Sequence, residues 1–191
     1  MAEYQLYSFA QSGNAYCAAL MLNLIGADWE PVWYDFFGTA PQRTPEFRET
    51  INEMGEAPVL VHGKKKFSQS GVILTYLANH SGKFKPQGED EELESLRWII
   101  FDNQKVNGFL GPFRFLKNFA KPAGDPVVMT FLQARAQGAL AIVRELRRTF
   151  PGAGDLAWRT EAAGRFIHHD LDPDGLVAAL RARPAVDLPR G

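Results

Sequence analysis

The chain has 191 residues, of which 46% are hydrophobic, enough to bury the core of one large domain or two small ones. Its 21 basic and 22 acidic residues give a formal net charge of -1, which argues against binding to nucleic acid or to an anionic membrane surface. The single cysteine, Cys17, excludes an internal disulfide framework and a CxxC redox motif, and it favours a cytoplasmic location. We expect no secretory signal, and no apolar run approaches the length of a membrane span.

The N-terminal residues predict a strand, a helix and a second strand. Residues 4–9 alternate in polarity and are rich in aromatic side chains, which is typical of a strand. Residues 15–25 are apolar on nearly every side, as in a helix packed against a sheet, and Gly26 is a suitable stop. Residues 28–36 predict a second strand. A crossover of this kind makes the two strands parallel.

A loop and a hairpin follow. Residues 37–54 predict a surface loop with one short helix at 45–52. Residues 59–61 and 65–67 predict two short antiparallel strands, joined by a turn whose consecutive lysines form a solvated edge. With the helix that follows, the expected order is β-α-β-α-β-β-α, a small α/β domain.

Two helix starts in this region carry exposed polar residues. Gln69 and Ser70 precede an apolar helix, where unpaired backbone N–H groups attract carboxylates, although Ser68 or Ser70 could simply be an N-cap. Ser12 precedes the first helix, where its hydroxyl could donate to an anion or act only as an N-cap. Local sequence leaves both alternatives open.

Other chemically active side chains have a structural interpretation. Cys17 lies in an apolar helix, where burial disfavours the thiolate, so we expect it to serve packing. Among the four histidines, only the His168-His169-Asp170 cluster has a neighbour at metal-ligand spacing, and adjacent residues do not share a helix face. We therefore expect no metal site. GxGxxG, P-loop and GxSxG motifs are absent from the sequence, so it gives no support to nucleotide binding or to a hydrolase.

The second half of the chain changes character after a polar segment rich in Gly and Pro. We expect residues 1–80 to form the first domain, 81–89 a linker and 90–191 an all-helical domain whose tail after about residue 150 is atypical. Residues 90–119 predict one long helix with a kink, or two helices, because two glycines and a proline interrupt the pattern (Gly108, Gly111, Pro112). Residues 127–150 predict a second long helix.

The motifs of the first eighty residues together resemble those of the cytosolic glutathione S-transferases, of the serine type and bacterial-like. LYSFAQSGNAYCAALMLNLIGADWEPVWYDF is similar to the family's first strand, catalytic loop, helix and second strand. TPEFRETINEMGEAPVLVHG and FSQSGVILTYLA are similar to its segments around a cis-proline and at the glutathione-binding helix. The resemblance covers about residues 4–80, and it implies a thioredoxin-like domain followed by a helical domain.

The resemblance also implies roles for particular residues. Ser12, with Asn14 as a second donor, would stabilise the glutathione thiolate. The glutathione would be held by the backbone of Ala57 before a cis Pro58, and by Gln69 and Ser70 at its γ-glutamyl carboxylate. Phe109 and Phe113 would line an apolar co-substrate pocket. Asp102 would contact the site of the partner subunit in a homodimer. The aromatic residues around that pocket otherwise predict core packing (Phe109, Phe113, Phe115, Phe119).

The implied activity is a detoxifying glutathione transferase that uses glutathione as a co-substrate, needs no cofactor and attacks an apolar electrophile. A glutathione-dependent isomerase and a non-catalytic module that binds glutathione, a ligand or a protein remain alternatives. A dithiol reductase fits poorly, because Ser12 stands where that chemistry needs a cysteine.

The sequence departs from the family's pattern at two places in the first domain. Asn52-Glu53-Met54-Gly55 replaces the usual Asn-Pro pair, and Gln69 stands where Glu is frequent. The tail also lacks the family's capping box, so we expect it to be divergent, truncated or read in a shifted frame.

Overall fold

The computed structural model describes residues 2–36 and 43–149, in two compact units. The first unit ends at Lys85 and the second begins at Pro86. The predictions for the tail after about residue 150, including the His168-His169-Asp170 cluster, lie outside the described residues.

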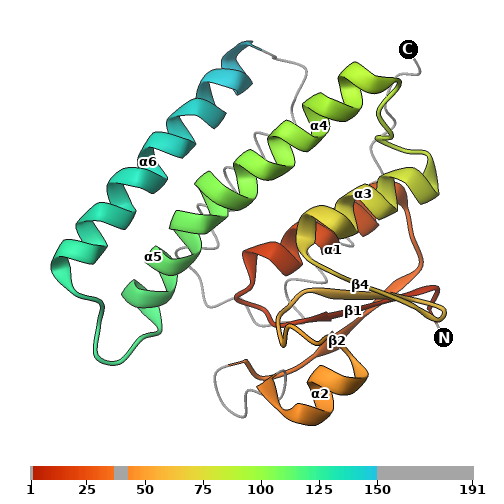
Figure 1. Ribbon diagram of the computed structural model, residues 1–191, viewed down its shortest axis with the longest axis horizontal. Helices are drawn as coiled ribbons and strands as arrows, with labels where there is room; N and C mark the ends of the chain where they lie inside the picture. Colours follow the sequence, from red (N-terminus) through yellow and green to blue (C-terminus); the bar gives the residue numbers. More distant parts are fainter. Residues whose placement is uncertain (1, 37–42, 150–191) are drawn as a thin grey trace. The chain divides into compact units, whose positions relative to one another are not determined.

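The first unit contains a four-stranded sheet in the order β2-β1-β3-β4 (Figure 1). β2 runs parallel to β1, and β3 is antiparallel to β4, as the sequence predicts. β3 also pairs antiparallel with β1, which the sequence did not indicate. The thioredoxin-like arrangement is thereby confirmed. Its elements are β1 (Tyr4–Ser8), α1 (Gly13–Ile25), β2 (Trp29–Trp33), α2 (Pro45–Thr50), β3 (Val59–His62), β4 (Lys65–Ser68) and α3 (Ser70–Ser81).

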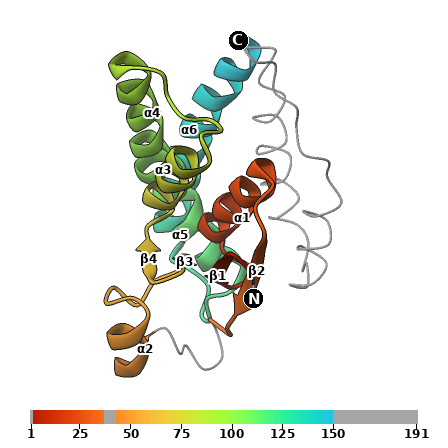
Figure 2. The ribbon, with the colours of Figure 1, turned by 90° about the vertical axis from the view of Figure 1, so that its right-hand side faces the viewer.

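The core of this unit lies between the sheet and the helices α1 and α3, which lie on the same face of the sheet (Figures 1 and 2). Its largest fully buried side chains come from both layers (Leu6, Leu22, Val59, Leu60, Ile73, Leu77). Burial of each such side chain contributes about 1.5–3 kcal/mol. Gly26 ends α1 in the left-handed conformation (φ 71°), as predicted. Cys17 is half-buried, so the expectation of a buried packing residue is only partly met.

The second unit is helical. It consists of α4 (Glu89–Phe101), a π-helical segment η2 (Asp102–Asn107), α5 (Gly108–Asn118) and α6 (Pro126–Thr149). The sequence predicts an interruption, but at Gly108–Pro112, whereas the irregular turn precedes these residues and Pro112 lies inside α5. A π turn adds one residue to each hydrogen-bonded ring of the helix.

The aromatic side chains of α5 do not all serve the core. Phe109 packs edge to face on Phe131 of α6, with a centroid separation of 6.2 Å, and the Arg135 guanidinium lies 5.2 Å from the Phe109 ring centre. Phe115 is 43% exposed, so its predicted core role is wrong. Residues two positions apart on a helix point in different directions, so Phe113 and Phe115 cannot share one buried face.

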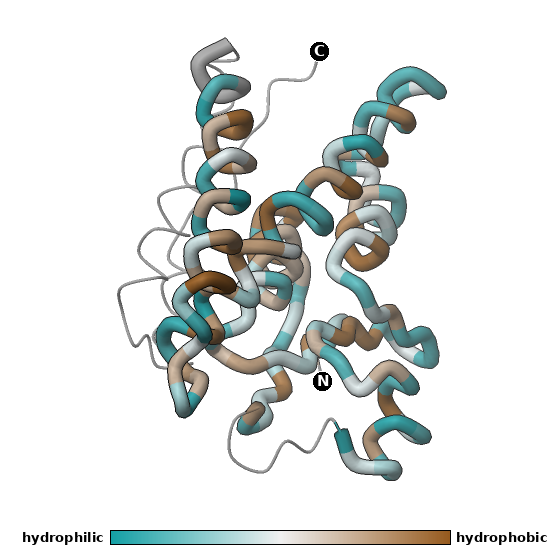
Figure 3. The backbone as a smooth tube through the Cα atoms, turned by 60° about the vertical axis from the view of Figure 1, so that its left-hand side comes forward, coloured by the Kyte–Doolittle hydropathy of each residue, from teal (hydrophilic) through white to brown (hydrophobic). Residues whose placement is uncertain are grey.

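One segment of α6, Pro126–Glu145, is long and apolar enough to cross a membrane by length and composition alone. One helix that passes this test is weak evidence, so the expectation of no membrane-spanning run stays a prediction. Core helices of soluble proteins pass the same test, so the finding assigns no membrane location. Figure 3 shows hydrophilic residues interspersed among hydrophobic ones along the long helices, which is typical of amphipathic helices.

Candidate functional site

The register of the sheet brings several chain segments to one edge of the first unit. Ser8, the last residue of β1, pairs with Trp33, the last residue of β2. Val59, the first residue of β3, pairs with Tyr7 on one side and with Ser68, the last residue of β4, on the other. The loops that lead into α1 and α3 therefore leave the sheet at this edge. The N-termini of both helices, with their unpaired N–H groups, follow directly.

Ser12 is the N-cap of α1. Its Oγ accepts a hydrogen bond from the Ala15 backbone N–H at 3.1 Å, and its side chain is buried, with 8% exposed. Its backbone is fixed as well, because its N–H donates to the Phe9 carbonyl and its carbonyl accepts from the Tyr16 N–H. Ser12 is therefore an N-cap, and its role toward an anion stays a prediction. The capping role occupies one lone pair of the hydroxyl and leaves its proton available for donation.

Asn14 lies in the first turn of the same helix. Its Oδ1 atom is buried and has no hydrogen-bond partner within the part of the chain that the structure describes. An unpaired buried carbonyl oxygen costs about 1–3 kcal/mol, so the position is unfavourable for folding alone. A hydrogen bond from a ligand donor to Asn14 Oδ1 would remove that cost.

The peptide bond between Ala57 and Pro58 is cis, as the resemblance implies. The segment before it is held by Asn52, which is only 3% exposed. The Asn52 side chain accepts from the Met54 N–H at 3.2 Å and donates to the Glu56 carbonyl at 3.0 Å. Asn52 therefore fixes the backbone that leads to Ala57. Sequence reasoning missed this role, although an Asn three residues before a Gly is a turn signal.

Gln69 and Ser70 open α3. Gln69 is the N-cap residue, at φ 66° and ψ 119°, and no side-chain hydrogen bond caps the helix, so the interpretation of Ser68 or Ser70 as a simple N-cap is wrong. The Gln69 amide instead donates to the Glu56 carboxylate at 2.9 Å. The Ser70 side chain is buried, with 7% exposed. The first N–H groups of α3 thus face the edge without a capping side chain.

An aromatic cluster that the sequence did not indicate lies at the ends of β1 and β2. Phe9 stacks on Phe36 with a centroid separation of 4.3 Å, and Phe47 of α2 packs edge to face on Tyr7 and Tyr34. Burial raises the pKa of Tyr34 above its usual range, and its hydroxyl has no hydrogen-bond partner among the described residues. These rings place aromatic side chains, two of them with hydroxyl groups, next to the loop that carries Ser12.

The remaining predicted site residues belong to the second unit, which is described by itself. Phe109 and Phe113 are half-buried on α5, and the Lys117 ammonium lies 5.5 Å from the Phe113 ring centre. Asp102 begins the π segment and accepts a hydrogen bond from Asn107 Nδ2 at 2.6 Å. Their predicted functional roles stay predictions.

Comparison with known proteins adds to this geometry. Residues 2–79 match the family model described as "Glutathione S-transferase, N-terminal domain". Glutathione S-transferase 1 of Dianthus caryophyllus is 41% identical over 73 residues, which are 38% of this chain and 32% of the relative. A glutathione S-transferase of the zeta class from Euphorbia esula is 40% identical over 73 residues, with the same coverage of 38% and 32%. The chain thus spans about a third of the length of these curated relatives.

Solved structures match over more of the chain. A glutathione transferase from Burkholderia graminis, with two glutathione molecules bound per subunit, has a TM-score of 0.69 and 26% identity, covering 96% of this chain and 85% of that one. Ure2p in complex with glutathione has a TM-score of 0.73 and 17% identity, covering 96% of both chains, which shows the fold alone. Residues 2–79 are thus similar to the N-terminal domain of the glutathione S-transferases.

Proposed function

We propose that the protein is a glutathione transferase that activates the glutathione thiol at the N-terminus of α1 and transfers the sulfur to an apolar electrophile. The observation that carries the proposal is the meeting, at one sheet edge, of two helix N-termini and the cis bond before Pro58. The match of residues 2–79 to the family's N-terminal domain supports it.

The α3 end of the site would bind the peptide part of glutathione. The γ-glutamyl carboxylate would accept hydrogen bonds from the uncapped N–H groups of α3 and from the Ser70 hydroxyl, with Gln69 beside it. The backbone of Ala57 would pair with the cysteinyl residue, as an added strand does. A proline at position 58 has no N–H group and cannot join this ladder, so the pairing would fall on its neighbour.

The α1 end of the site would carry the chemistry. A free thiol has a pKa of about 8.5, so it is mostly protonated at neutral pH. The thiol would release its proton to solvent. The Ser12 hydroxyl, polarised because it accepts a hydrogen bond from the Ala15 N–H, would donate a hydrogen bond to the resulting thiolate, and the helix dipole would stabilise the thiolate further. The thiolate would then attack carbon, forming a C–S bond as the leaving group departs with its electron pair. The unpaired Asn14 carbonyl suits a donor of the ligand, such as an amide N–H.

The test measures conjugation of glutathione to a chromogenic aryl halide. We expect Ser12→Ala to lower kcat/KM roughly tenfold or more, a loss of about 1.4 kcal/mol in transition-state stabilisation. Ser12→Ala also removes an N-cap and costs about 1 kcal/mol of folding stability. Ser12→Thr keeps both the cap and the hydroxyl, so we expect it to retain most of the activity.

Thr44→Ala is the matched control for the lost cap. Thr44 caps α2 through a hydrogen bond from the Phe47 N–H at 3.2 Å, outside the proposed thiol site. We expect this variant to lose similar stability and to keep full activity. Unchanged activity of Ser12→Ala would remove Ser12 from its role. Absence of turnover in the wild type, with glutathione still bound in calorimetry, would favour the non-catalytic binding module.

A further inference from the structure

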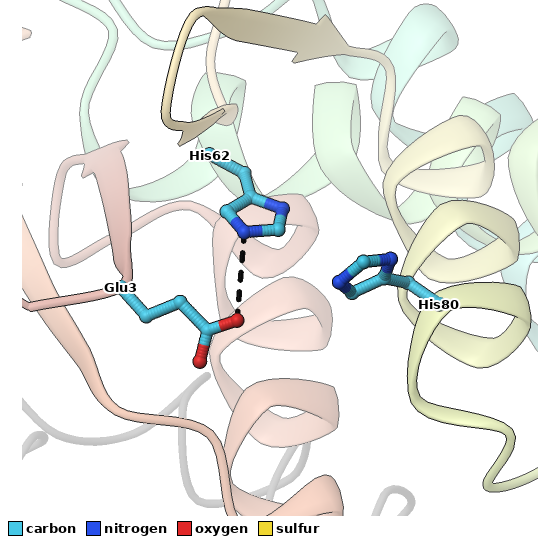
Figure 4. A group of neighbouring side chains, drawn as sticks. All are labelled: Glu3, His62 and His80. Carbon is cyan, nitrogen blue, oxygen red and sulfur yellow. Dashed lines mark ion pairs between the residues drawn. The ribbon is translucent and has the colours of Figure 1, made fainter.

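Three side chains from separate segments of the first unit converge outside the glutathione site. Glu3 precedes β1, His62 ends β3 and His80 lies in the last turn of α3. Each offers one potential metal-ligand atom, and these three atoms all lie within 4.8 Å of one another. Figure 4 shows the three side chains turned toward one another. Sequence spacing gave no indication of this cluster, because its members lie far apart in the chain.

The separations suit a small divalent ion. Bonds of about 2.0–2.1 Å in a tetrahedral zinc site place neighbouring ligand atoms about 3.3 Å apart. His62 Nε2 already lies 3.4 Å from Glu3 Oε1. His80 is exposed, and its ring centre lies 4.9 Å from that of His62, so rotation of this exposed side chain brings the three ligand atoms together.

A neighbouring residue orients the central ligand. His62 Nδ1 lies 2.7 Å from the Tyr76 hydroxyl, and the His62 ring packs 4.4 Å from the Tyr4 ring. When Nδ1–H donates to Tyr76, the Nε2 lone pair is directed toward Glu3. Metal-bound histidines almost always make such a second hydrogen bond, which fixes the tautomer. The Tyr76 ring also stacks on His80, with an interplanar angle of 12°.

We propose that Glu3, His62 and His80 bind a zinc-class divalent ion, with Tyr76 as the residue that orients His62. Two imidazoles and one carboxylate leave a fourth coordination position for water. The cluster lies at the C-terminal end of α3, about 15 Å along the helix from Ser70, so it is separate from the glutathione site. The ion links the start of β1, the end of β3 and the end of α3, and it therefore stabilises the first unit when bound.

The test titrates the chelator-treated full chain with Zn²⁺ in calorimetry, without glutathione, because a free thiol competes for the metal. We expect one equivalent to bind to the wild type, and binding to weaken at least tenfold in His80→Ala and in Glu3→Gln. Tyr76→Phe keeps the ring and removes the hydroxyl, so we expect roughly tenfold weaker binding. The melting temperature should rise with Zn²⁺ in the wild type and not in His80→Ala.

A double variant, His168→Ala with His169→Ala, is the matched control, because it removes the other histidines of the chain. Its Zn²⁺ affinity should equal that of the wild type. Equal binding in wild type and His80→Ala would overturn the proposal, as would loss of binding in the double variant alone. His80→Ala and Glu3→Gln both replace exposed side chains, so their thermal unfolding without metal should match that of the wild type within a few degrees.

Discussion

The Ser12 hydroxyl offers one proton and two lone pairs, so the two roles that the sequence left open do not compete for the same atom pair. Capping of α1 uses a lone pair, whereas thiol activation needs the proton. The two roles are compatible, and each would support the other. An accepted hydrogen bond polarises the hydroxyl, and the cap fixes its position at the helix start. A residue that caps a helix can therefore still be a candidate for catalysis.

Gln69 offers a way to separate ligand binding from folding. Its φ of 66° is unfavourable for any residue other than glycine and costs about 1–3 kcal/mol. Gln69→Gly removes the side chain together with this strain, whereas Gln69→Ala removes the side chain and keeps the strain. We expect the free energy of unfolding of Gln69→Gly to exceed that of Gln69→Ala by about 1 kcal/mol in urea denaturation.

Both Gln69 variants should bind glutathione about tenfold more weakly than the wild type in calorimetry, because both lose the same amide. Wild-type affinity in both would show that the Gln69 side chain takes no part in binding. A lower stability of the glycine variant than of the alanine variant would contradict the strain argument.

At the scale of elements, the sequence predicted the strands and helices whose residues follow a clear pattern of polarity. Burial alternates along β1 as the sequence predicts, α1 is buried at most of its apolar positions, and Gly26 and Pro58 marked element boundaries correctly. The π segment was not predicted, because its sequence DNQKVN differs from an ordinary helix only in hydrogen bonding, which leaves no mark on polarity. Gly108 gave an indirect signal, since a Cβ atom there would lie 3.1 Å from the Asn103 carbonyl oxygen.

Two glycines, one after α1 and one inside α6, test whether backbone conformation or packing decides the effect of a Gly→Ala substitution on stability. At Gly26 a Cβ atom would meet nothing closer than Lys83 Nζ at 3.9 Å, but φ is +71°. We expect Gly26→Ala to lower the free energy of unfolding by about 1 kcal/mol. Gly138, inside α6, has no atom within 4 Å of a Cβ and is exposed, so Gly138→Ala should raise it by about 0.5–1 kcal/mol.

Urea denaturation followed by circular dichroism measures both variants. The urea concentration at the midpoint of unfolding should fall in Gly26→Ala and rise in Gly138→Ala. A stabilised Gly26→Ala would show that the left-handed turn after α1 is not required by the fold.

At the scale of the molecule, composition and pattern predicted an α/β unit followed by a helical unit. They predicted only some of the residues of the candidate site. Ser12, Pro58 and Ser70 could be found because each sits beside a strand end or helix start, which the pattern locates. Asn52 and the Glu3–His62–His80 cluster could not, because their roles depend on which distant segments the sheet brings together. The aromatic rings beside the Ser12 loop were missed for the same reason.

The central claim is that one sheet edge of the first unit binds glutathione between two helix N-termini. An NMR titration of the ¹⁵N-labelled full chain with glutathione tests it most directly, because each backbone amide reports separately. The account predicts shifts concentrated at the amides of the two helix starts and the segment before Pro58 (Gly13, Asn14, Ala57, Ser70, Gly71), with the amide of Gly138 unchanged. Saturating glutathione that leaves these amides unshifted, or shifts only residues elsewhere, would contradict it.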